Sequence, residues 1–384
     1  MNTLDLINKV KKFRKYLNHK KIEYIRLVRQ AISYRLFLRA KSADTIEDFN
    51  PYKCETIVVN VIGKGIGDAI ICSGLISILR KGNYKVYPII SKGANVFLFT
   101  HLIPNDGIIV TTGNGYGLPK QGRDKLQFDL FISAWEFNGR NYRLLDLMRK
   151  LKYRYSIGCP RGLEKQYRNH IEDVQHSGTH LSEYFKSIID KFFPHLSKYQ
   201  YAYAIEIPGK ALDKVSQFVD KITCHGIHRL LVVSCITRDP NKCFSRDNIS
   251  RLCHELATSK HQYKVVVLNY EKSPFTINNE NIIPNPFASL SDVIALVTKA
   301  YCLVTIDTCF VHVGCQFNVN SLCFYNNKVI GDYYQGNVLY GPGPHYTNAL
   351  MVMPEEQGHD EYGVDLRKIN YQFIHDALLE KKLL

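Results

Sequence analysis

The chain has 384 residues, of which 45% are hydrophobic and 22% are charged. This balance excludes an intrinsically disordered protein and predicts a well-packed globular one. Because one hydrophobic core rarely serves so long a chain, we expect two α/β domains. The formal net charge is +15, and residues 1–41 carry +10 of it, so the remainder is only mildly basic.

The basic N-terminal segment is also amphipathic. Apolar residues recur at three- and four-residue spacing within 6–17 and again within 25–36. This pattern predicts a basic helical extension over residues 1–49, in two helices broken near Asn18. Packing on the protein's own surface and attachment to an anionic membrane surface both explain it. Nucleic acid is a weaker alternative, because the block contains no recognisable reading motif, and we expect none as a partner.

The lengths of the apolar runs and the spacing of the cysteines also indicate the class of protein. The sequence has no run of about 18 apolar residues, so we expect no membrane-spanning segment, and its N-terminus is a poor signal peptide. The eleven cysteines contain no CxxC pair and are scattered through expected strands and helices. This usage is typical of reduced core residues in a cytoplasmic protein and argues against a thiolate zinc site.

The first half of the chain is organised around Gly67-Asp68. A β-branched run from Thr56 to Ile62 predicts a strand that is covered on both faces. A glycine-rich turn follows, and apolar residues from Ala69 onwards then recur at helical spacing. Asp68 would therefore lie near a helix N-terminus, just past the carboxyl end of a strand. It either caps the helix or serves as a functional carboxylate in the crevice of an open sheet.

The expected strands and helices alternate along the rest of the chain, which predicts parallel β-α-β units with right-handed crossovers. In the first half we expect strands at 84–90, 107–112 and 128–134, and helices at 93–102, 141–152 and 181–193. In the second half we expect strands at 229–235, 263–268, 302–306 and 321–325, and helices at 210–222, 245–258, 290–299 and 365–383.

Polar residues follow three strands of the second half. The loop after strand 229–235 contains Thr237, Arg238 and Lys242, whose hydroxyl, guanidinium and ammonium groups suit phosphate binding. Glu271 follows strand 263–268, where a carboxylate can accept hydrogen bonds from ribose hydroxyls.

The third group is Asp307-Thr308-Cys309-Phe310-Val311-His312. It follows strand 302–306 and enters a helix whose N-terminal amides can meet a diphosphate. A capping Asp307 with a core histidine is the simpler interpretation of the same residues.

Several known motifs are absent from the sequence. It contains no GxGxxG or GxxxxGK[ST] phosphate loop and no GxSxG elbow. It also has no Asp-x-Asp pair, so metal-dependent sugar transfer is not suggested.

Taken in order over residues 55–330, the motifs resemble glycosyltransferase family nine, the ADP-heptose:lipopolysaccharide heptosyltransferases. The resemblance implies an α/β fold of the GT-B type, with two facing Rossmann-like domains and parallel sheets. We expect an acceptor domain at 50–205, a nucleotide-sugar domain at 206–360, and a C-terminal helix at 361–384 that packs back towards the first domain.

By position, the resemblance implies that Asp68 is the general base. It implies that the donor-binding residues are Ser234, Thr237, Arg238, Lys242, Glu271, Asp307, Thr308 and His312. The sequence departs from the family at Gly74, where a proline is usual, and at Cys309, where a glycine is usual.

The implied function is inverting, metal-independent transfer of heptose from ADP-heptose to a hydroxyl of the lipopolysaccharide or lipooligosaccharide core, without a cofactor. The acceptor is anionic and lipid-linked, so residues 1–41 would hold this cytoplasmic enzyme at the inner leaflet of the inner membrane. Three alternatives stay open: another nucleotide-sugar donor, a nucleotide-sugar epimerase, and a catalytically silent scaffold with the same fold.

Overall fold

The structure is a computed structural model that describes residues 21, 25, 28, 49–61, 65–90, 93–111, 127–133, 147–148, 150–158, 169–170, 179–272, 274–330, 334–354 and 363–384. The basic extension predicted for residues 1–49 lies almost wholly outside this part of the chain. Most of the helix predicted at 141–152 also lies outside it.

The chain divides into two compact units that are not continuous in sequence. The first consists of Met1–Gly63, Asn83–Gly93 and Asp106–Asp173. The second consists of Lys64–Gly82, Ala94–Asn105 and Val174–Leu384. The segment that carries Asp68 therefore belongs to the same unit as the whole second half of the chain. The domain boundaries expected from the sequence stay a prediction.

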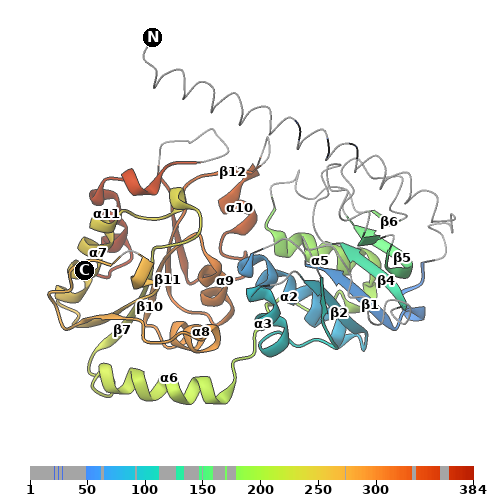
Figure 1. Cartoon of the computed structure of the whole chain (residues 1–384), viewed down its shortest axis with the longest axis horizontal. Coiled ribbons are helices and arrows are strands. Elements are labelled where there is room, and N and C mark those ends of the chain that lie inside the picture. The colour runs from blue at the N-terminus through green and yellow to red at the C-terminus, as the bar shows by residue number, and fades with distance from the viewer. Residues whose placement is uncertain are drawn as a thin grey trace, which may run out of the picture. The chain divides into compact units, whose positions relative to one another are not determined.

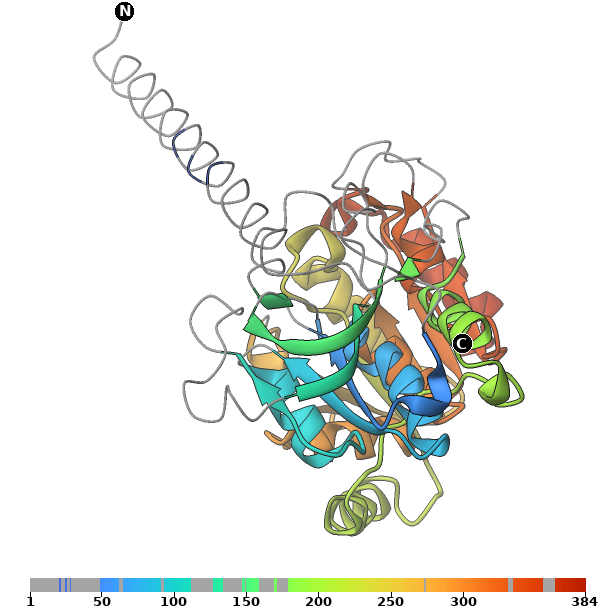
Figure 2. The ribbon, with the colours of Figure 1, turned by 90° about the vertical axis from the view of Figure 1, so that its right-hand side faces the viewer.

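The first unit contains a parallel sheet (Figures 1 and 2). Its described strands are β1 (Thr56–Asn60), β2 (Lys85–Ile90), β3 (Ile109–Val110), β4 (Gln127–Ser133), β5 (Lys152–Gly158) and β6 (Asn169–His170). They lie in the order β3-β2-β1-β4-β5-β6, which is the strand order of a dinucleotide-binding fold. Strand β1 is buried from Ile57 onwards, as its continuous apolar run predicts.

The second unit contains a second parallel sheet. Its described strands are β7 (Arg229–Ser234), β8 (Tyr263–Val267), β9 (Ile282–Pro284), β10 (Cys302–Ile306), β11 (Ser321–Phe324) and β14 (Ala349–Val352). Their spatial order is β9-β8-β7-β10-β11-β14, so this sheet repeats the order of the first. Two short strands, β12 (Val329–Ile330) and β13 (Tyr334–Gln335), pair antiparallel in a separate two-stranded sheet. The predicted α/β class with two parallel sheets is confirmed.

The helices of the second unit pack on one another in several pairs. They are α2 (Ile66–Lys81), α3 (Ala94–His101), α5 (Leu181–Phe192), α6 (Gly209–Ile222), α7 (Arg246–Thr258), α8 (Leu290–Thr298), α9 (Cys309–Gln316), α10 (Gly336–Tyr340) and α11 (Tyr371–Glu380). Helices α7 and α11 pack in the core of the second sheet. None of the described helices is long and apolar enough to cross a membrane.

The C-terminal segment differs in detail from the helix predicted at 365–383. A short 3-10 helix, Leu366–Lys368, comes first, and α11 then begins anew because the Asn370 side chain accepts a hydrogen bond from the Gln372 amide. Ile374 and Leu378 of α11 are wholly buried in the core formed by α7 and the second sheet. Packing of this segment towards the first domain stays a prediction.

Some strands were not predicted, and their sequences show why. Strand β5 begins Lys-Tyr-Arg-Tyr, so it lacks the continuous apolar run of the central strands. Strands β9 and β14 lie at the two edges of the second sheet and are three and four residues long. Short edge strands contribute too few apolar residues for a period to be recognised.

Tyr201 interrupts the backbone of helix α2 beside Gly74. Its hydroxyl accepts a hydrogen bond from the Leu75 amide at 3.0 Å and donates one to the Ile71 carbonyl. An unbroken helix would pair those two backbone groups with each other. A Cβ atom on Gly74 would lie 2.5 Å from Cζ of the tyrosine and 2.9 Å from the Ala202 carbonyl oxygen. The close approach of Tyr201 therefore requires glycine at position 74, where the family that the sequence resembles usually has proline.

Two histidines are buried in the second unit. His180 caps α5: its Nδ1 accepts a hydrogen bond from the Ser182 amide, and its Nε2 donates to the Gly341 carbonyl at 3.0 Å. Burial lowers the pKa of His180 to about 4. Burial, reinforced by the nearby His180, lowers the pKa of His312 to about 3. Both imidazoles are therefore neutral at neutral pH.

The close contact at Gly74 predicts the effect of adding a methyl group. Gly74→Ala should lower the free energy of unfolding by about 2 kcal/mol, because overpacking of a buried site typically costs that much. Gly209→Ala is the matched control, since a Cβ there meets no atom within 4 Å and lies in the first turn of α6. Denaturant unfolding measures both. Equal stability of Gly74→Ala and the parent chain would contradict the tight packing.

The buried histidines predict a loss of stability in acid. In the unfolded chain each binds a proton below pH 6.5, whereas in the folded chain it stays neutral down to its lowered pKa. The free energy of unfolding should therefore fall as the pH drops from 6.5 towards 4. His180→Gln should make the fall shallower by about 1 kcal/mol per pH unit. His225→Asn removes an exposed imidazole and serves as control. If the free energy of unfolding fell with pH as steeply in His180→Gln as in the parent chain, a buried neutral imidazole would be contradicted.

Candidate active site

The second sheet has its topological switch point between β7 and β10, because the strand order reverses there. Ser234 of β7 pairs with Thr305 of β10, so the loops that follow the two strands begin at the same level. Open α/β sheets bind their ligands in the crevice at this position. The two polar groups singled out in the sequence, 237–242 and 307–312, follow these two strands.

The loop after β7 is held in shape by its own side chains. The Thr237 amide donates a hydrogen bond to the Cys243 sulfur at 3.2 Å, and the Cys243 thiol donates to the Thr237 and Asp239 carbonyls. The Asp239 side chain accepts a hydrogen bond from the Asn241 amide and caps a 3-10 turn, Pro240–Lys242. The turn brings Lys242 back towards the sheet.

The segment after β10 enters α9 through a threonine cap. The Thr308 hydroxyl accepts a hydrogen bond from the Phe310 amide and lies 3.1 Å from the Thr305 hydroxyl. Thr305 in turn donates to the Ser234 carbonyl of β7 at 3.2 Å. This chain of hydrogen bonds fixes the N-terminus of α9 at the switch point, where its amides favour an anion.

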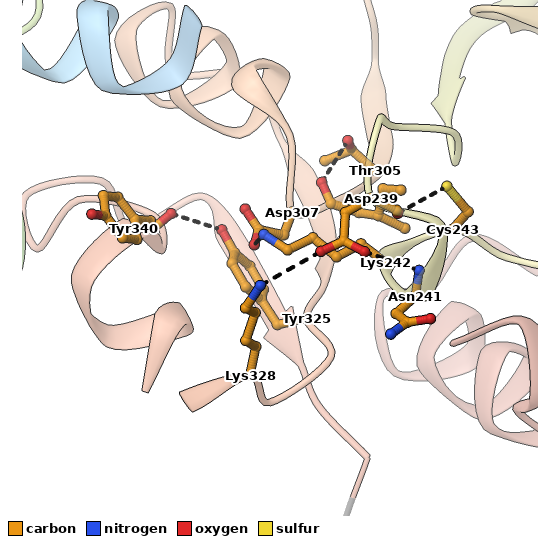
Figure 3. A network of polar contacts seen from close by, with 10 residues as sticks. Asp239, Asn241, Lys242, Cys243, Thr305, Asp307, Tyr325, Lys328 and Tyr340 are labelled. Carbon is orange, nitrogen blue, oxygen red and sulfur yellow. Dashed lines mark hydrogen bonds and ion pairs between the residues drawn. The ribbon is translucent and has the colours of Figure 1, made fainter. Parts of the chain in front are cut away.

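Lys242 and Asp307 form an ion pair across the switch point (Figure 3). The Lys242 ammonium donates to Oδ2 of Asp307, and the two side chains are 21% and 16% exposed. One end of the pair follows β7 and the other follows β10. The partial exposure leaves a cation and a carboxylate within reach of a ligand that enters the crevice.

Asp68 lies in the first turn of α2 and is partly exposed. Its carboxylate accepts a hydrogen bond from the Gly65 amide at 2.6 Å, so it caps its own helix. Helix α2 packs against α9, and Gly67 contacts the Cys309 backbone and the His312 ring at the start of α9. The structure therefore brings the turn that carries Asp68 to the helix that begins at the switch point.

Four predicted donor-binding residues stand apart from this group. Arg238 and Glu271 are not buried, and no hydrogen bond or ion pair of the described residues joins either side chain to Lys242 or Asp307. Ser234 is fully buried, and its hydroxyl has no hydrogen-bond partner among the described residues. His312 is 3% exposed and lies beneath the start of α2.

Lys328 also lies at the site, although it belongs to none of the sequence motifs. Its ammonium lies 3.6 Å from Oδ2 of Asp239, and the Tyr325 hydroxyl in the same loop region donates to the Tyr340 carbonyl (Figure 3). Lys328 is far from the loop at 237–242 in sequence and belongs to no periodic pattern.

The thiol of Cys309 occupies the first position of α9. Burial raises its pKa to about 12, so it is a neutral side chain rather than a nucleophile at neutral pH. Across the described part of the chain, no group of three or more histidine, cysteine, aspartate or glutamate side chains is arranged to hold a metal ion. The groups that face the switch point thus include the Lys242 ammonium, the Asp307 carboxylate and the N-terminus of α9, with Asp68 on the helix packed against it.

No family model matches the chain, but comparison with known proteins gives a relative in sequence and relatives in fold. The chain is 22% identical over 356 residues to an Escherichia coli (strain K12) protein whose name, lipopolysaccharide heptosyltransferase 4, is provisional. The match covers 90% of this chain and 91% of that protein.

Solved structures show the same fold. A glycosyltransferase of family nine from Veillonella parvula DSM 2008 superposes with a TM-score of 0.64 at 16% identity, covering 86% of this chain and 97% of that chain. The E. coli heptosyltransferase WaaC with ADP-2-deoxy-2-fluoro heptose gives a TM-score of 0.57 at 14% identity, covering 85% and 99%.

These relatives are glycosyltransferases, which is the class of enzyme that the sequence predicts. Their similarity extends along nearly the whole chain and confirms the resemblance that the motifs indicate. The chain thus resembles one lipopolysaccharide heptosyltransferase of provisional name in sequence along nearly its whole length, and it has the fold seen in solved structures of glycosyltransferase family nine.

Proposed function

We propose that the chain transfers heptose from ADP-heptose to a hydroxyl group of the lipopolysaccharide core, with inversion and without a metal ion. The observation that carries this proposal is the Lys242–Asp307 pair at the switch point, with the turn of Asp68 packed on the adjoining helix. The relatives named above support the donor and the acceptor class. The GT-B arrangement of the two sheets is part of the same proposal.

The donor side must stabilise a departing diphosphate. As the bond between the anomeric carbon and the phosphate oxygen breaks, negative charge develops on ADP. In this proposal the Lys242 ammonium and the N-terminal amides of α9 stabilise that charge, which is electrostatic catalysis by preorganised groups. Thr237 lies in the same loop as Lys242 and donates to the phosphates through its hydroxyl. Asp307 directs Lys242 and accepts hydrogen bonds from the sugar hydroxyls.

The acceptor side must remove a proton. In the proposed step the acceptor hydroxyl attacks the anomeric carbon from the face opposite ADP, and its proton passes to the Asp68 carboxylate. A single displacement of this kind inverts the anomeric configuration. Asp68 suits the role because its carboxylate is partly exposed and is held in place by the Gly65 amide.

The basic segment at 1–41 fits an anionic, lipid-linked acceptor. Clustered lysines and arginines beside a leaflet of acidic lipid each contribute about 1 kcal/mol of attraction. We infer peripheral attachment at the inner leaflet of the inner membrane from the net charge of +10 and the amphipathic spacing of this segment.

The donor side is tested by calorimetry with ADP and ADP-heptose, and with UDP-, GDP- and CMP-sugars. Lys242→Ala should weaken ADP and ADP-heptose alike by about 10- to 100-fold, because a charge-assisted hydrogen bond is lost. Asp307→Ala should weaken ADP-heptose more than ADP, because only the sugar loses its hydrogen bonds to the carboxylate. Lys260→Ala, at the opposite end of the strands, is the control.

Asp68→Asn should keep donor affinity and lose about 100-fold or more in turnover on a heptose-deficient lipopolysaccharide acceptor.

The outcomes of this experiment separate the alternatives. A preference for another nucleotide-sugar would keep the mechanism and change the product, whereas product formation without an acceptor would indicate an epimerase. A folded chain that binds no donor would contradict the proposal and favour a scaffold.

Membrane attachment has its own test. Deletion of residues 1–49 should release the protein from vesicles that contain acidic phospholipid at low salt, because the clustered positive charge is removed. Sedimentation with these vesicles and with vesicles of neutral phospholipid measures the effect. Unchanged binding after the deletion would overturn this part of the proposal.

A further inference from the structure

The backbone of Gly67 lies directly on the ring of His312. A Cβ atom placed on Gly67 would stand 2.8 Å from Cδ2 and 3.2 Å from Nε2 of the imidazole. It would also stand 3.5 Å from the Cα atom of Cys309. Real Cβ atoms essentially never approach another atom as closely as 2.8 Å, so only glycine permits this contact. The glycine that precedes Asp68 is therefore explained by a side chain more than two hundred residues away.

The His312 ring is held in place by packing. It is 3% exposed and meets the ring of Tyr203 edge to face, with centroids 5.9 Å apart and planes at 81°. Tyr203 in turn packs on Tyr346, with centroids 5.2 Å apart. Among the described residues, Nδ1 of His312 has no hydrogen-bond partner. A buried ring between an aromatic side chain and a backbone is a rigid support, because interiors at this density have little room to adjust.

This support lies one residue from the proposed base. The Asp68 carboxylate accepts a hydrogen bond from the Gly65 amide, so the backbone from Gly65 to Asp68 contributes to its position. Gly67 lies within that segment and rests on His312. A displacement of Gly67 away from the ring would carry the Asp68 carboxylate with it.

We propose that His312 is a positioning residue for Asp68, acting through contact of its ring with Gly67. The inference rests on the proposed function, because it assigns a role towards the proposed base. It replaces the donor-binding role that the family resemblance implies for His312. It also links the two motifs. Helix α9 begins at the donor side, and His312 on the same helix, three residues after Cys309, positions the proposed base on the acceptor side.

The test is a double-mutant cycle of Gly67→Ala, His312→Ala and both together. Gly67→Ala should reduce kcat by about 100-fold, the effect expected when a catalytic group is displaced by about 1 Å. The KM for ADP-heptose should stay within about twofold, because the donor side is untouched. His312→Ala makes room for the methyl group that Gly67→Ala introduces. Adding Gly67→Ala to His312→Ala should therefore cost less than about threefold in kcat.

Gly314→Ala is the matched control. Gly314 lies in α9, as His312 does, and a Cβ atom there would stand 2.8 Å from the Ser321 hydroxyl. This contact is as close as the one between a Cβ on Gly67 and His312, but it is with another residue. Gly314→Ala should lower stability without lowering kcat, and His312→Ala should not compensate for it. Multiplicative effects of Gly67→Ala and His312→Ala on kcat would overturn the proposal. A raised donor KM at unchanged kcat in His312→Ala would also overturn it and restore the donor-binding role.

A readout independent of turnover separates this proposal from the proposed function. The NMR resonance of the Gly65 amide reports its hydrogen bond to Asp68. It should shift in Gly67→Ala and return towards its position in His312→Ala when both changes are present. If the parent chain transfers no heptose, the proposed function fails, and this resonance still decides whether His312 locates Asp68. An unshifted resonance in Gly67→Ala would refute the positioning role.

Discussion

The ion pair between Lys242 and Asp307 is the interaction on which the candidate site depends. A half-buried ammonium or carboxylate is costly to leave without a partner, so each side chain fixes the other. Because one follows β7 and the other follows β10, the pair ties together the two loops at the switch point of the second sheet. In the proposed function, a diphosphate that enters the crevice would meet the N-terminus of α9 and a cation that is already in place, so little reorganisation would be needed.

Close packing of backbone on aromatic rings positions the other part of the site. Helix α2 is approached twice at glycines, by His312 at Gly67 and by Tyr201 at Gly74. At Gly74 the Tyr201 hydroxyl bonds to two backbone groups that an unbroken helix would pair with each other. The tyrosine is therefore held on the helix by polar as well as apolar contacts. Both rings and α2 belong to the unit that contains the second sheet, and the contact at Gly67 brings the turn of Asp68 to the start of α9.

The sequence predicted the central strands, most helices and the switch-point loops, because continuous apolar runs and helical periods reflect local burial. The family resemblance implied that Lys242 and Asp307 belong to one donor site, and the structure joins the two side chains in an ion pair. The sequence could not place Lys328, because its contact with Asp239 joins distant segments. Nor could it decide between a core histidine and a donor-binding one at position 312, because that difference depends on Tyr203 and Gly67, which pack on His312 from other segments.

The most direct test of the account is a crystal structure of the chain with ADP-2-deoxy-2-fluoro heptose, the compound bound in a WaaC structure. The account predicts that the diphosphate contacts the Lys242 ammonium and the first amides of α9. It further predicts that the sugar lies beside Asp307, with the Asp68 carboxylate on the face opposite the diphosphate. A nucleotide bound away from the switch point, or a diphosphate that contacts neither Lys242 nor α9, would contradict it.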